Sequence, residues 1–269
     1  MKVYLFIAFC LMISAKVIAQ HSPASTQPFL FSVNTLTNDA SKWNLQFAGS
    51  YGRRATGQFG YDGLGQQLGI KGSLGNRFTI SGSLALGFAN TGKTASAQQL
   101  EIIRDIIGGK KSSGFRLGGG LGIGRDWSNV KSASGRIAAS FDKMNWRMIG
   151  NLRFEKAFDS SRDKLDFITS FGIHRQLAKT WFVGLEAIGQ DLEGFWEKDE
   201  AEGGAKLMVG PSVNFLPTKS KLSFSLAGGP VFYATRSNVA ASAAFRELTP
   251  FGTENGYTLR ALINFSLGK

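Results

Sequence analysis

The stretch YTLRALINFSL, Tyr257 to Leu267, alternates with a period of two residues. One face takes Tyr257, Leu259, Ala261, Ile263, Phe265 and Leu267, and the other takes Thr258, Arg260, Leu262, Asn264 and Ser266. Only Leu262 breaks the separation of apolar from polar. A period of two is that of a β-strand, whose side chains point alternately to the two faces of a sheet. A strand that is apolar on one face and small or polar on the other fits a membrane-spanning β-barrel with lipid outside and water inside.

Segments with the same alternation recur almost from end to end, separated by short turns rich in Gly, Asn, Asp, Ser and Lys. In one of them, Trp43 and Tyr51 share a face eight residues apart. At the usual strand rise and tilt this distance is roughly 20 Å, near the height of a lipid-facing band between aromatic girdles. The polar faces are largely Gly, Ser and Ala, whereas a water-facing sheet would carry Lys, Glu and Thr. We therefore predict an all-β fold, a single antiparallel transmembrane barrel over residues 42–269, rather than a secreted β-sandwich.

The number of strands depends on two ambiguous segments. Eleven segments alternate, with Val130–Phe141 the weakest, whereas bacterial single-chain barrels have an even number. Gln27–Leu36, within an N-terminal segment over 20–41, could be a first strand. Ser96–Ile107 has the spacing of a short amphipathic helix, yet as a strand it places the short turns on one side and the long loops on the other. We favour twelve strands, within a range of about ten to fourteen.

Residues 1–19 have the layout of a secretory signal peptide. A long uncharged run follows Lys2, and Val17 and Ala19 stand at the two positions that determine cleavage. The run is too short to cross a bilayer as a helix. The only cysteine, Cys10, lies inside this segment, so we expect a mature chain without disulfides. The predicted destination is the bacterial outer membrane.

The chain is basic, with a formal net charge of +12. Its basic residues are spread along the sequence rather than clustered, which argues against nucleic acid as a partner. The alternation predicts that these charged residues line the lumen: Lys71, Arg116, Asp126, Arg136, Arg147, Arg153, Glu155, Asp166, Glu186, Lys206 and Arg260. Two interpretations stay open. The mixed signs can pair and close the lumen, or the surplus of Arg and Lys can line a narrow path that favours small anionic solutes.

Few residues could support catalysis. The predicted mature chain holds only His21 and His174, and Ser170 lies about 13 Å from His174 along the same strand face. A serine on a neighbouring strand could still pair with His174. An outer-membrane hydrolase with its site on the barrel rim is therefore the alternative function.

Two further motifs have simpler interpretations. Gly87–Thr94 matches the phosphate-binding pattern G-x-x-x-x-G-K-[ST], but it follows an alternating strand rather than a buried parallel one. The acidic stretch Asp191–Glu202 lacks the spacing of a calcium loop, and we interpret it as a solvated outer loop. We expect no bound metal and no cofactor.

The signal peptide, the alternating segments and the last strand together resemble porin-like bacterial outer-membrane β-barrel proteins. The resemblance implies an integral barrel surrounded by outer-membrane lipid, either structural or forming a narrow, weakly anion-preferring channel for small solutes. In that family the barrel-assembly machinery reads a last strand that ends in an aromatic residue. The residues implied here are Tyr257, Phe265 and Leu267, although Phe265 is followed by Ser-Leu-Gly-Lys rather than ending the chain.

Overall fold

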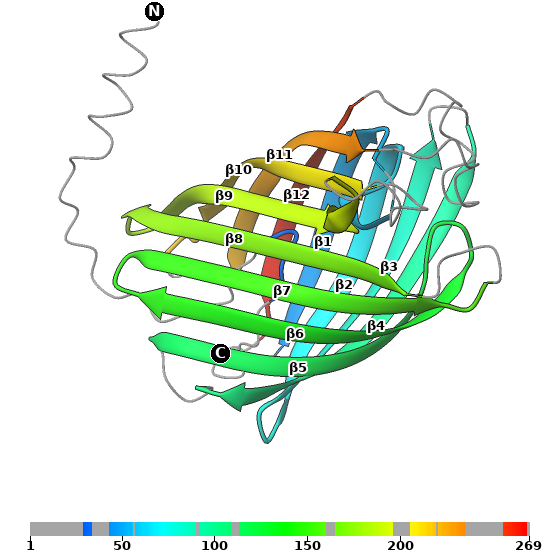
Figure 1. Ribbon diagram of the computed structural model, residues 1–269. Coiled ribbons are helices and arrows are strands. Elements are labelled where there is room, and N and C mark those ends of the chain that lie inside the picture. Colours follow the sequence, from blue (N-terminus) through cyan, green and yellow to red (C-terminus); the bar gives the residue numbers. More distant parts are fainter. Residues whose placement is uncertain are drawn as a thin grey trace, which may run out of the picture.

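The computed structural model describes residues 29–33, 43–55, 57–89, 92–108, 113–159, 165–195, 205–218, 220–234 and 255–267. Within this part of the chain, twelve antiparallel strands close into one barrel, and β6 to β8 cross in front of β1 and β2 in Figure 1. The strands are β1 (Trp43–Arg53), β2 (Gly63–Gly75), β3 (Phe78–Ala89), β4 (Thr94–Ile107), β5 (Gly114–Arg125), β6 (Lys131–Lys143), β7 (Trp146–Ala157), β8 (Asp166–Ala178), β9 (Trp181–Gln190), β10 (Ala205–Phe215), β11 (Leu222–Ala234) and β12 (Gly256–Ser266). Two short 3₁₀ turns, η1 (Gly57–Phe59) and η2 (Leu192–Phe195), follow β1 and β9. None of the described helices is long and apolar enough to span a bilayer.

The predicted all-β barrel and its twelve strands are confirmed. Ser96–Ile107 belongs to β4, so the alternative of an amphipathic helix there is wrong. Glu101, Ile103 and Asp105 are buried, whereas the residues between them are exposed. The alternative of a first strand over Gln27–Leu36 is wrong for its described part, because residues 29–33 form no strand and lie inside the barrel.

The first and last strands close the barrel. β1 pairs with β12 in a continuous register that runs from Asn44 opposite Ser266 to Arg53 opposite Tyr257. Each strand therefore has hydrogen-bonded neighbours on both sides, and the sheet has no open edge to expose to lipid.

The outer surface has the pattern of a membrane protein. Leucine, isoleucine and phenylalanine side chains are exposed on most strands, a surface that only lipid or detergent would cover. Aromatic residues begin or end many strands on the side where β1 starts and β12 ends, including Trp43, Trp146, Trp181 and Phe215. Tight turns such as Asn76-Arg77 lie on this side, which is therefore the periplasmic end. This closed barrel with an apolar outer band is that of an integral outer-membrane protein.

The inner surface is polar and largely buried. Serine, asparagine and charged residues alternate with the outward apolar residues along β6, β7 and β8. At the outer end, η1 folds inward, where Phe59 is fully buried and its carbonyl accepts a hydrogen bond of 2.8 Å from Thr258 Oγ1. Phe59 packs with Met208 and Val231 in an apolar cluster inside the barrel. The outer mouth is thus narrowed by the loop that follows β1.

Candidate functional site

The lumen holds a short piece of the chain itself, residues 29–33, which we call the plug segment. Its backbone is bound by side chains of the barrel wall. The amide of Phe31 donates to Glu186 Oε2 at 2.8 Å. Asn151 makes two bonds to Val33, accepting from its amide at 2.6 Å and donating to its carbonyl at 2.9 Å. This paired recognition satisfies backbone groups of the plug segment that would otherwise be buried without partners.

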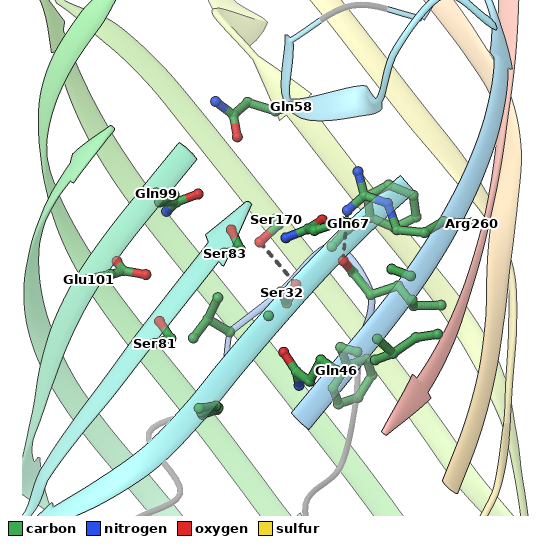
Figure 2. Close-up of a pocket in the computed structure, with 18 of the residues that line it drawn as sticks. Ser32, Gln46, Gln58, Gln67, Ser81, Ser83, Gln99, Glu101, Ser170 and Arg260 are labelled. Carbon is green, nitrogen blue, oxygen red and sulfur yellow. Dashed lines mark hydrogen bonds between the residues drawn. The ribbon is translucent and has the colours of Figure 1, made fainter. Parts of the chain in front are cut away.

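Side chains add further contacts on both sides of the plug segment. Ser32 Oγ donates to Ser170 Oγ at 2.9 Å, a bond drawn in Figure 2. Arg260 donates from Nη1 to the carbonyl of Leu30 at 3.2 Å, and its guanidinium lies 4.8 Å from the centre of the Phe31 ring. The plug segment is therefore held by strands from opposite parts of the barrel.

A buried polar cluster lies beneath the start of the plug segment. His174 Nε2 lies 2.9 Å from Ser212 Oγ, and Ser212 Oγ donates to Glu186 Oε1 at 2.5 Å. Asn214 Nδ2 lies 2.8 Å from His174 Nδ1. The ring of Phe29 stacks on His174 at 4.2 Å between centroids.

The direction of these bonds opposes a catalytic role for His174. With Asn214 donating to Nδ1, the neutral ring carries its proton on Nε2 and donates to Ser212, so it cannot take a proton from that serine. His174 and Ser212 are fully buried in the lumen, under Phe29, rather than on the rim. The cluster instead positions Glu186 for its bond to the plug segment.

Beside the plug segment is a cavity of about 230 Å³. Its uncharged lining is rich in carboxamides and hydroxyls, which converge in Figure 2: Gln46, Gln58, Gln67, Gln99, Ser81, Ser83 and Ser170. Its charged lining has four basic residues and one acidic residue: Lys71, Arg136, Arg153, Arg260 and Glu101. The cavity therefore has a formal charge of +3, from four positive charges and one negative charge.

Ion pairs reduce this excess without removing it. Arg136 Nε lies 2.6 Å from Glu101 Oε1, and Arg153 Nη2 lies 2.7 Å from Glu155 Oε2. Glu155 is not part of the cavity lining. In a confined space of low dielectric, a surplus of fixed positive charge raises the local concentration of anions.

The predicted lumen residues fall into several groups. Those buried in the barrel interior are Arg116, Arg136, Arg153, Glu155, Asp166, Glu186 and Lys206. Lys71 and Arg260 are partly exposed to the cavity. Arg147 lies over the Phe182 ring at 4.5 Å and, with Arg116, pairs with Asp142. Asp126 is not in a strand: its carboxylate accepts the amides of Ser128 and Val130, both at 2.9 Å, and so closes the β5–β6 turn.

Sequence reasoning missed several residues of this interior. Glu101 and Asp105 were obscured by the helical spacing of their segment, and they emerge once it is treated as a strand. Asp142 and Asn151 sit on inward positions that the alternation of β6 and β7 does predict. Nothing in the sequence of the plug segment distinguishes it from a strand.

The acidic loop is described only at its start. The structure covers Asp191 to Phe195, and the remainder of Asp191–Glu202 lies outside the described residues. Asp191 Oδ1 accepts the Phe167 amide at 3.0 Å, and burial raises the pKa of this carboxyl to about 6. Among the described residues, no cluster of His, Cys, Asp and Glu could hold a metal ion.

The segment Gly87–Thr94 joins two antiparallel strands. β3 ends at Ala89 and β4 begins at Thr94, and the Gly92 amide donates to the Ala89 carbonyl at 2.9 Å. A tight hairpin of this kind opens no helix, so it lacks the setting of a nucleotide-binding loop.

Solved outer-membrane porins share this architecture. A NanC porin structure aligns with a TM-score of 0.55 at 9% identity, covering 83% of this chain and 100% of that one. The KdgM porin in complex with disordered oligogalacturonate aligns with a TM-score of 0.54 at 11% identity, covering 83% and 99%. The chain has the porin fold. No protein-family model matches the sequence, and comparison with curated proteins finds no relative.

Proposed function

We propose that this protein is a narrow outer-membrane channel for small anionic solutes, restricted by its own plug segment. The observation that carries the proposal is the cavity beside the plug segment, with its four basic residues and one acidic residue. The other charged residues of the interior carry no such surplus, because their three basic residues are outnumbered by five acidic ones: Arg116, Arg147 and Lys206 against Asp105, Asp142, Glu155, Asp166 and Glu186. The surplus is thus concentrated where a solute has room to lie.

The uncharged lining narrows the class of solute. Carboxamides and hydroxyls both donate and accept hydrogen bonds, so they suit a solute that carries hydroxyl groups as well as negative charge. Basic side chains would neutralise the charge, and the glutamines would replace lost water around the hydroxyls. An acidic saccharide has this chemistry, and the oligogalacturonate bound to the KdgM porin is one example of the class.

Planar-bilayer recording of the purified protein tests this function. The proposal predicts small, discrete conductance steps and a reversal potential shifted toward the anion equilibrium potential in a salt gradient. A purely structural barrel would give no steps, and a cation-preferring reversal potential would refute the anionic lumen.

We also propose that outer-membrane lipid surrounds the barrel and that its last strand carries the assembly signal. Tyr257, Phe265 and Leu267 are exposed. Tyr257 and Phe265 lie near opposite ends of β12, the strand that closes the barrel against β1. We expect Phe265→Ser to reduce several-fold the fraction of barrel that is folded in membranes, because the aromatic residue presents the last strand to the assembly machinery. The folded fraction is measured as the form that migrates faster in unboiled SDS gels.

Leu259→Ser serves as the matched control, since it removes an exposed apolar side chain from the same face of the same strand. Both variants should refold equally well in detergent, where no machinery acts. An equal loss of folded barrel in membranes for the two variants would contradict a special role for Phe265.

A further inference from the structure

The outer surface of the barrel carries a groove of about 760 Å³ over the strands from β1 to β6. One row of paired residues forms its floor and walls: Ile70 lies opposite Gly82, Gly82 opposite Leu100, and Leu100 opposite Ile123. The isoleucines and the leucine of this row are exposed. Gly82 has no side chain between them, which leaves a trough in the apolar surface.

The adjacent row changes from apolar to basic along the groove. Leu68 lies opposite Leu84, which is followed across the strands by Gln98, Arg125 and Lys131. These five residues all line the groove. One end of the groove therefore suits hydrocarbon and the other suits an anion.

The basic end lies at the outer rim of the barrel. Arg125 ends β5 and Lys131 begins β6, on the side opposite the tight periplasmic turns. Lys156 of β7 is also exposed. It lies close to Lys131 because it pairs with Ala133, two residues further along β6. Arg125 donates to Asn129 Oδ1 and to Ser96 Oγ, both at 2.9 Å, which holds its guanidinium at the rim.

The nearest carboxylate in the turn is already engaged. Asp126 accepts the amides of Ser128 and Val130, so it is used in closing the turn. The three cations thus face the headgroup level of the outer leaflet above an apolar trough.

We propose that this groove is a binding site for a phosphorylated lipid of the outer leaflet. The phosphate would lie among Arg125, Lys131 and Lys156, and an acyl chain would fill the trough over Gly82. Anionic headgroups gain from basic side chains at the membrane surface, whereas the acyl chain gains from close packing in the trough. A second copy of the barrel fits less well, because a two-fold contact through this row would bring like charges together.

Native mass spectrometry of the detergent-purified protein, titrated with lipid A, tests the site. We expect Lys131→Gln with Lys156→Gln to weaken lipid binding about 25-fold, at about fivefold for each charge lost near a membrane surface. Lipid A from which the phosphates have been removed should bind the wild-type protein more weakly than intact lipid A, by a similar factor. Arg53→Gln removes a charge from the outer end of β1, away from the groove, and should leave binding unchanged.

A second variant tests the trough without changing any charge. A Cβ at Gly82 would meet only ordinary contacts, at 3.6 Å from Leu100 Cδ1 and 3.9 Å from Ile70 Cγ2, so Gly82→Leu should fold and fill the groove. We expect it to weaken lipid A binding several-fold. The faster migration of unboiled samples in SDS gels verifies that each variant is folded.

The proposal is overturned if the double charge variant binds lipid A as the wild type does, or if phosphate removal has no effect. Protein dimers that replace lipid adducts, and that are lost in Gly82→Leu, would also overturn it, because the occupant would then be a second copy.

Discussion

A protein that lacks residues 29–33 is expected to conduct several-fold more current per channel than the intact protein. The plug segment occupies the lumen between Glu186, Asn151 and Arg260, and leaves beside it a cavity of about 230 Å³. Its removal enlarges the open cross-section of the lumen at this level, and conductance rises with that cross-section. Single-channel recording in planar bilayers measures the change, after unboiled SDS gels have shown that the truncated barrel is folded.

Ser32→Ala is the matched control for the truncation. It removes the bond to Ser170 but leaves the backbone contacts of Phe31 and Val33 in place. We expect it to conduct as the intact protein does. Equal conductance of the truncated and intact proteins would show that residues 29–33 do not limit the path.

Replacing Lys71 and Arg260 together with glutamine is expected to lower the anion preference several-fold. The two substitutions reduce the formal charge of the cavity lining from +3 to +1. Because the field in a confined lumen follows its fixed charge, anions lose most of their advantage over cations. The reversal potential in a salt gradient measures the preference independently of the size of the conductance.

Two variants separate charge from structure in this experiment. Glu101→Gln makes the lining more positive and should raise the anion preference. Arg260→Lys keeps the charge but loses the planar group that lies over Phe31, so it should keep the preference even if it loosens the plug segment. An unchanged reversal potential in the Lys71 and Arg260 double variant would rule out this cavity as the selective region.

Much of the barrel could be predicted because its physics is local. Each strand must present apolar residues to lipid and small or polar residues to the lumen, and this requirement is visible at every second position. The one segment that also looked helical, β4, contains an irregularity: its register with β5 shifts between Asp105 and Ile107. That shift leaves Ile106 and Ile107 both exposed, which breaks the two-residue period and mimics helical spacing.

The site could not be predicted because its contacts are distant in sequence. The plug segment is bound by residues more than a hundred positions away, such as Asn151 and Glu186. Its own alternation of phenylalanine and valine is that of a strand. His174 on β8 contacts Ser212 on β10 across Gly184 of the intervening strand β9. A side chain at Gly184 would collide with the His174 ring and the Ile173 backbone, so the contact depends on this glycine. An absent side chain of this kind has no periodic signature.

Disulfide trapping in native outer membranes tests the central claim, that residues 29–33 occupy the lumen. Ser32→Cys with Ser170→Cys places two thiols where the hydroxyl oxygens lie 2.9 Å apart, and Cys10 lies in the predicted signal peptide. Ser32→Cys with Ser83→Cys is the control, because Ser83 also lines the cavity but lies on β3, five strands from β8 around the barrel. We predict that mild oxidation gives an intramolecular disulfide in the first pair and not in the second. Free thiols in the Ser32 and Ser170 pair, labelled fully by a membrane-impermeant reagent, would contradict a plugged barrel.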